Sequence, residues 1–139
     1  MILTTENESL HISSKAENIV LVEKFIDEVC TIFKVNEEVY GNILVALTEA
    51  VNNAIQHGNK NNPNKNVDVS FKYSPEQISF TIKDEGAGFD YTNLPDPTDP
   101  KNIEKLNGRG VFLMRNLADK VSFEENGSKV ILDFNLLNA

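Results

Sequence analysis

The sequence contains one cysteine, Cys30, no tryptophan and two histidines among its 139 residues. A single cysteine excludes an intrachain disulfide, and it does not make a zinc-binding cluster with only two histidines. No stretch approaches the roughly 20 apolar residues that span a membrane, and the N-terminal segment lacks the apolar run of a signal peptide. We therefore expect a soluble, cytoplasmic protein.

Positive charge is also scarce. The chain has 13 Lys and Arg residues against 21 Asp and Glu residues, which gives a formal net charge of −8 at pH 7. Because nucleic acids and anionic membrane surfaces attract clustered positive charge, this balance argues against direct binding to either. Hydrophobic residues make up 40% of the chain, and a chain of about 150 residues buries roughly 70% of its unfolded surface. We expect residues 1–139 to form one domain.

Hydrophobic periodicity predicts eight elements in a fixed order. They are a strand at 8–13, helices at 15–33 and 37–57, strands at 67–73 and 78–83, a helix at 110–119, and strands at 121–125 and 129–135. Hairpins require antiparallel neighbours, and three amphipathic helices suffice to cover one face of a sheet. The pattern predicts an α+β fold, a two-layer sandwich.

Short motifs predict where several elements begin and end. Ser14 and Glu17 have the spacing of a capping box, Asn36 is a candidate N-cap, and Gly58 is the expected residue just past the second helix. Asn126-Gly127 is typical of a two-residue hairpin turn.

The second helix carries a polar side opposite its apolar face. At 100° per residue, Asn42, Glu49 and Asn53 fall together, and Val45 and Ala46 flank them in place of charged residues. A carboxylate and an amide four residues apart share one helix face, where they could act as a base and a hard-cation ligand. The alternative is an ordinary solvated face.

Two glycine-containing motifs follow. Asp84-Glu85-Gly86-Ala87-Gly88 offers an acceptor and a backbone that a ligand can approach closely, although the same pattern also makes a plain tight turn. Residues 84–107 have almost no periodicity and suggest a lid. Asn107-Gly108-Arg109-Gly110 then opens the third helix, where backbone N–H groups form an anion site to which Lys105 or Arg109 adds charge. A purely structural helix start is the alternative.

In this order, the motif from Glu49 to Gly58 and the two glycine motifs resemble the N, G1 and G2 boxes of the gyrase, heat-shock chaperone, histidine kinase and mismatch-repair ATPase superfamily. The motif Glu-Ala-Val-X-Asn-Ala-Ile-X-His-Gly at residues 49–58 is most similar to that of the anti-sigma-factor serine-protein kinases of bacterial partner-switching systems. The resemblance implies a Bergerat-type ATP-binding fold with a mostly antiparallel, mixed sheet.

The resemblance also implies roles for individual residues. Glu49 would be the general base for a serine hydroxyl, Asn53 would hold Mg²⁺, and Asp84 would accept a hydrogen bond from the adenine amino group. The remaining nucleotide contacts would come from Gly86, Gly88, Lys105, Gly108, Arg109 and Gly110, with an ATP lid at about 93–107. Asn52 and His57 would only shape the pocket.

The function that the resemblance implies is that of an Mg-ATP-dependent serine-protein kinase. It would phosphorylate an anti-sigma-factor antagonist, sequester a sigma factor in its other state, and form a homodimer. Two alternatives stay open: a non-catalytic, nucleotide-gated binding module, and a detached ATPase domain of a histidine kinase.

Overall fold

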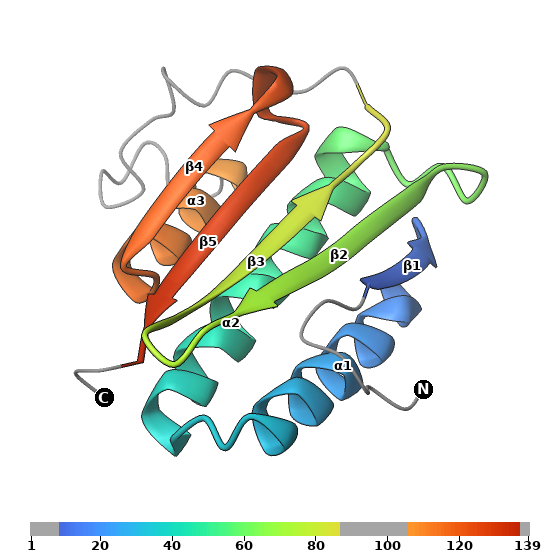
Figure 1. Ribbon diagram of the computed structural model, residues 1–139. Coiled ribbons are helices and arrows are strands. Elements are labelled where there is room, and N and C mark those ends of the chain that lie inside the picture. The colour runs from blue at the N-terminus through green and yellow to red at the C-terminus, as the bar shows by residue number, and fades with distance from the viewer. Residues whose placement is uncertain (1–8, 87–105, 137–139) are drawn as a thin grey trace.

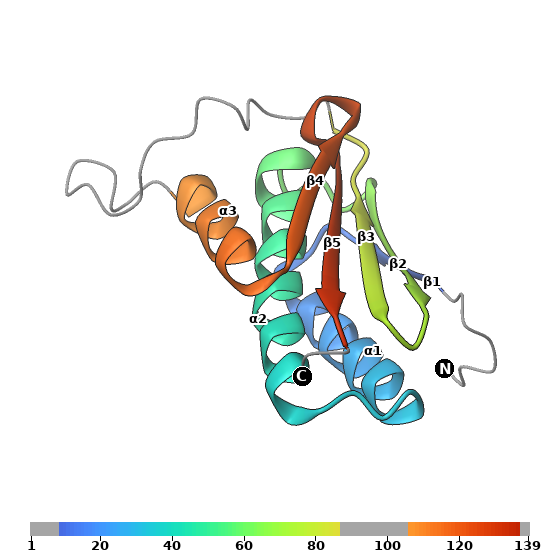
Figure 2. The ribbon, with the colours of Figure 1, turned by 60° about the vertical axis from the view of Figure 1, so that its left-hand side comes forward.

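The structure is a computed structural model of the chain, and it describes residues 9–86 and 106–136. Within them, three helices lie on one face of a five-stranded sheet (Figures 1 and 2). The helices are α1 (Ile19–Ile32), α2 (Glu37–Asn53) and α3 (Leu106–Leu117), and the strands are β1 (Ser9–Ser13), β2 (Asn66–Tyr73), β3 (Gln77–Lys83), β4 (Lys120–Glu124) and β5 (Lys129–Asn135). The predicted two-layer α+β sandwich is confirmed.

The strand order is β1-β2-β3-β5-β4, and every pairing among the described strands is antiparallel. The parallel pairing that a mixed sheet would include is therefore not found among them. The register aligns Phe71 with Phe80 and Phe80 with Leu132, so large side chains from three adjacent strands form one row. Because side chains alternate along a strand, this row faces the helices.

The core lies between the two layers. Its largest fully buried side chains come from all three helices, from β3 and β5, and from a π-helical turn, Ala54–Gly58, that follows α2. They are Phe25, Phe80, Phe134, Ile26, Ile43, Leu47, Ile55, Ile78, Ile82, Met114, Leu132 and Val22. Phe25 meets Phe71 edge to face, with ring centroids 5.9 Å apart. Cys30, 5% exposed, belongs to the same core.

Helix α2 begins as predicted and ends differently. The Asn36 side chain accepts a hydrogen bond from the N–H of Val39, which confirms the N-cap. At the other end the helix continues into a π-helical turn, Ala54–Gly58, and the left-handed residues are Lys60 and Asn61 rather than Gly58. The prediction of Gly58 as the helix-ending residue was wrong. Its lack of a side chain serves a close contact instead, described below.

Two other local predictions were wrong. The proposed capping residue Ser14 donates its hydroxyl to the Lys65 carbonyl, and no side chain caps the short 3₁₀ turn Ala16–Asn18. The connection from β4 to β5 is a 3₁₀ turn, Glu125–Gly127, with positive φ at Glu125 and Gly127, rather than a two-residue turn.

The start of α3 was also placed too late. The helix begins at Leu106, so Gly108 and Gly110 lie inside its first turns, and the last two residues of the predicted lid, 106 and 107, are helical. Glycine has low helix propensity, which led to the later prediction. The rest of the predicted lid lies outside the described residues.

Candidate functional site

A cavity lies between the C-terminal end of α2, the helix α3 and one end of the sheet. It is lined by Ala50, Asn53, Ala54, Ile82, Asp84, Met114, Phe123, Gly127, Ser128 and Val130. Most of these side chains are apolar, and Asp84 is the one carboxylate among them. An apolar wall with a few placed polar groups is the usual composition of a small-molecule site.

Asp84 directly follows β3 and is 7% exposed. Its backbone N–H donates to the Ser128 carbonyl at 2.9 Å, and its Oδ1 accepts from the N–H of Gly86 at 2.8 Å. Burial raises the pKa of the carboxyl above its ordinary value, while the Gly86 N–H and the positive charge of Lys65 lower it. Because a buried carboxylate is costly without hydrogen bonds, Asp84 is suited to accept another one from a ligand inside the cavity.

Two glycines allow a close contact beside this carboxylate. A Cβ added to Gly58 would lie 2.3 Å from Oδ2 of Asp84, and a Cβ added to Gly86 would lie 1.9 Å from the carbonyl oxygen of Gly58. Neither site tolerates a side chain without movement of the neighbouring atoms. The end of α2 and the segment after β3 therefore touch backbone to backbone.

Asn53 and Glu49 lie one turn apart on the same side of α2, and both are partly buried. Asn53 lines the cavity, whereas Glu49 is not among the described residues that line it. The Nδ2 atom of Asn53 is buried, and no described residue accepts its hydrogen bond. The same holds for Nε2 of His57. An unpaired buried amide is expensive, which makes Asn53 a strong candidate for a ligand contact.

Asn53 also bears on the question of a metal. Within residues 9–86 and 106–136, no three His, Cys, Asp or Glu side chains gather closely enough to hold a metal ion. Mg²⁺, however, usually takes only one or two protein ligands and keeps water and phosphate oxygens for the rest. The unpaired Nδ2 of Asn53 is a hydrogen-bond donor and suits an acceptor such as a phosphate oxygen, whereas the amide oxygen of the same side chain is the type of ligand that Mg²⁺ takes. Asn53 thus fits an ion brought in with phosphates and does not fit one that the protein holds alone.

The first turn of α3 faces the same end of the molecule. The first four N–H groups of any α-helix have no partner within it, and here they belong to residues 106–109. Gly108, Arg109 and Gly110 are helical in backbone. Gly88 and Lys105 lie outside the described residues. The third polar residue of α2, Asn42, lines a separate hollow near the start of that helix, with Glu38, Asn116 and Asp119, and does not join the site.

A family comparison supports this location. The family model described as histidine kinase-like ATPase domain matches residues 12–134. The chain belongs to this family. Its members share an ATP-binding domain, and the matched range includes the cavity and every described site residue. No helix in the described part of the chain is long and apolar enough to cross a membrane.

Comparisons with individual proteins agree with this family assignment. The chain is 34% identical over 91 residues to the serine-protein kinase RsbW of Staphylococcus aureus strains JH9 and Newman. The alignment covers 60% of this chain and 57% of each relative, so the match spans little more than half of the relatives' length. A solved structure of the RsbU and RsbW domains of Rv1364c from Mycobacterium tuberculosis has the same fold, with a TM-score of 0.65 at 12% identity. It matches 94% of this chain and 32% of that one.

Sequence reasoning missed part of the site. Gly58 was assigned to helix termination and to the end of the Glu49–Gly58 motif but not to a contact with Asp84, and Met114 and Ser128 were not considered. The signal for Gly58 was its position directly after His57, at the end of the helix that carries the candidate residues Glu49 and Asn53. Ser128 contributes only its backbone carbonyl to Asp84, so its residue type gave no signal.

Proposed function

We propose that this histidine kinase-like ATPase domain binds ATP with Mg²⁺ in the cavity and transfers the γ-phosphoryl group to a serine of a partner protein. The observation that carries the proposal is the buried Asp84 carboxylate at the end of an apolar cavity that extends to the unpaired amide of Asn53. The adenine ring is apolar on its faces and carries an amino donor, which matches the first half of this arrangement. The relatives named serine-protein kinase support the transfer step.

Each predicted residue has a part in this scheme. Asp84 accepts the hydrogen bond of the adenine amino group, and Gly86 and Gly88 leave space beside the base. The free N–H groups at the start of α3, which include those of Gly108 and Arg109, face the phosphates, Gly110 leaves space beside them, and Lys105 adds positive charge. Asn53 supplies its amide oxygen to Mg²⁺, which neutralises charge on the phosphates when bound.

Glu49 is the general base in the proposal. It takes the proton of the serine hydroxyl while the serine oxygen forms a bond to the γ-phosphorus, and the bond to the bridging oxygen breaks so that ADP leaves. One turn of helix separates Glu49 from Asn53, so the base and the phosphate end of the nucleotide lie on the same side of α2.

The partner in this proposal is an anti-sigma-factor antagonist, and a sigma factor binds in the alternative state. The protein acts as a homodimer in the cytoplasm. Light scattering after size-exclusion chromatography tests the dimer, and a monomer at every concentration from micromolar upward would contradict it.

The test of transfer uses γ-labelled ATP, Mg²⁺ and a heat-treated extract of the source organism, in which endogenous kinases are inactive. We expect one small protein labelled on serine with the native chain, no label with Glu49→Gln, and full label with Glu38→Gln. Glu38 lies exposed at the far end of α2, so that control loses the same charge from the same helix.

Nucleotide binding separates the proposal from the non-catalytic alternative. Glu49→Gln should retain ATP affinity within about twofold, because a general base contributes to the transition state rather than to ground-state binding. A native chain that binds ATP and labels nothing would instead identify a nucleotide-gated binding module.

A further inference from the structure

Asn59 follows the π-helical turn at the end of α2 and is 1% exposed. Its backbone N–H donates to the Ala54 carbonyl at 2.8 Å. Its side-chain Oδ1 accepts from the backbone N–H of Glu85 at 2.8 Å, and its Nδ2 donates to Ser14 Oγ at 2.9 Å and to the carbonyl of Asn66 at 3.0 Å. Every polar atom of this buried amide is therefore used.

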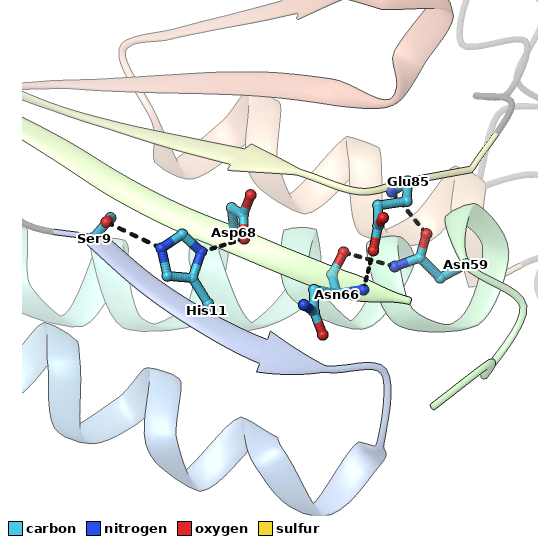
Figure 3. A network of polar contacts seen from close by, with 6 residues as sticks. All are labelled: Ser9, His11, Asn59, Asn66, Asp68 and Glu85. Carbon is cyan, nitrogen blue, oxygen red and sulfur yellow. Dashed lines mark hydrogen bonds and ion pairs between the residues drawn. The ribbon is translucent and has the colours of Figure 1, made fainter. Parts of the chain in front are cut away.

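Glu85 completes a ring of hydrogen bonds, which Figure 3 shows from close by. The backbone N–H of Asn66, the first residue of β2, donates to the Glu85 carboxylate, while the Asn66 carbonyl accepts from Asn59. Asn59 in turn accepts from the Glu85 N–H. We call these three residues, Asn59, Asn66 and Glu85, the asparagine clasp.

The clasp residues are the sequence neighbours of the residues in contact at the site. Asn59 directly follows Gly58, and Glu85 lies between Asp84 and Gly86. Gly58 touches both Asp84 and Gly86. One hydrogen bond of the clasp, from the Glu85 N–H to Asn59 Oδ1, directly joins the two segments whose backbones meet beside the Asp84 carboxylate. The other two bonds connect the same segments through Asn66 at the start of β2. Loss of the clasp would leave that close contact without its nearest polar support.

We propose that the asparagine clasp positions Asp84 for recognition of the nucleotide base, with Asn59 and Glu85 as positioning residues. This inference rests on the proposed function, in which Asp84 meets an adenine. A hydrogen bond discriminates between adenine and guanine only if the acceptor is held where the adenine amino group lies, because guanine presents a carbonyl there. A carboxylate that moves by a rotamer loses that discrimination.

Glu85 is the better residue to test, because its side chain is exposed, whereas Asn59 is buried and its removal leaves the Glu85 N–H and the Asn66 carbonyl unpaired. Glu85→Ala removes the acceptor of the Asn66 N–H. Glu85→Gln keeps an acceptor oxygen at the same place and serves as the conservative variant. Neither change alters the backbone of the segment.

Asp68 offers a matched control for Glu85, because it lies on β2, the strand that begins with the clasp residue Asn66. It accepts a hydrogen bond from His11 of β1 on the exposed side of the sheet (Figure 3). Asp68→Ala therefore removes an exposed carboxylate and one link between segments, as Glu85→Ala does. Asp68 belongs to a separate network, in which His11 also contacts the hydroxyl of Ser9.

The experiment measures the dissociation constants of Mg-ATP and Mg-GTP by titration calorimetry, with thermal unfolding of each nucleotide-free variant alongside. We expect Glu85→Ala to lower the preference for ATP over GTP about fivefold, the effect of losing one hydrogen bond. Glu85→Gln and Asp68→Ala should keep the native preference. The Tm of nucleotide-free Glu85→Ala should stay close to that of Asp68→Ala, since both lose one exposed contact.

The outcomes distinguish the clasp from the function on which it depends. If the native chain prefers ATP and Glu85→Ala keeps the same preference, or weakens ATP and GTP equally, the clasp is only structural and the proposal falls while the proposed function stands. If the native chain binds neither nucleotide, both are overturned.

Discussion

The backbone of Gly58 lies against the carboxylate of Asp84, so closely that a methyl group on Gly58 would sit 2.3 Å from Oδ2. The contact joins the end of the helix that carries Glu49 and Asn53 to the segment that carries the buried acceptor. Two motifs whose residues Gly58 and Asp84 are 26 positions apart in the sequence therefore meet in space.

Gly58→Ala should abolish tight ATP binding. The added methyl group must displace the Asp84 carboxylate or the end of α2, and overpacking of this kind lowers the free energy of unfolding by about 1–3 kcal/mol. We expect at least a tenfold loss in ATP affinity, measured by calorimetry, because the displaced carboxylate loses its contact with the base.

Gly41 provides the control for this variant. It lies within α2, and an added Cβ would meet nothing within 4 Å. Gly41→Ala should raise the free energy of unfolding by about 0.5–1 kcal/mol, as expected for alanine in a helix, and leave ATP affinity unchanged. Equal ATP affinity in the two variants would contradict the role assigned to Gly58.

The stability of nucleotide-free Asp84→Asn should depend on pH relative to the native chain. Burial raises the pKa of Asp84 in the folded protein, so the folded state binds the proton more tightly than the unfolded state does. Ionisation of Asp84 therefore lowers the free energy of unfolding as the pH rises through that pKa. Asparagine can still accept from the Gly86 N–H and carries no charge.

We accordingly expect Asp84→Asn to have the higher Tm at pH 7.5, with an advantage that shrinks as the pH falls through the raised pKa of the native Asp84 carboxyl. Differential scanning calorimetry across this range measures the difference. A Tm difference that stays constant or grows towards low pH would show that Asp84 is not held as a buried carboxylate.

Cys30 should be inert in the native protein. Burial, and secondarily the negative charge of Asp27, raises the pKa of its thiol to about 12. At pH 8 only about one thiol in ten thousand is then ionised, and the thiolate is the reactive form. Ellman's reagent should label Cys30 within minutes in denaturant and far more slowly in native buffer. Rapid stoichiometric labelling of the folded chain would contradict this burial.

The layers of the fold were predictable because helix and strand periods are strong in this sequence. The apolar faces around Phe25, Leu47 and Phe80 repeat at 3.6 or 2 residues, and the Asn36 cap is a local interaction between near neighbours. Gly58 and Ser14 were misread because their contacts, with Asp84 and Lys65, are distant in sequence. A residue type reports its local preference but not the tertiary neighbour that overrides it.

The site divides in the same way. Asp84 and Asn53 stood out as polar residues in distinctive contexts, and the structure brings both to one cavity. Asn42 shares the helix face of Glu49 and Asn53 by angle alone, yet it lies three turns before Asn53 and lines another hollow. The asparagine clasp was beyond sequence reasoning, because its bonds join three separate segments and half of the bonding groups belong to the backbone.

The central claim is that Asp84 recognises the adenine of ATP in this cavity. The most direct test is titration calorimetry of Mg-ATP and Mg-GTP with the native chain and with Asp84→Asn, under conditions where both are folded. We predict that the native chain prefers ATP and that Asp84→Asn weakens ATP far more than GTP. Equal weakening of both nucleotides, or unchanged ATP affinity, would contradict the account and leave Asp84 as part of a structural turn.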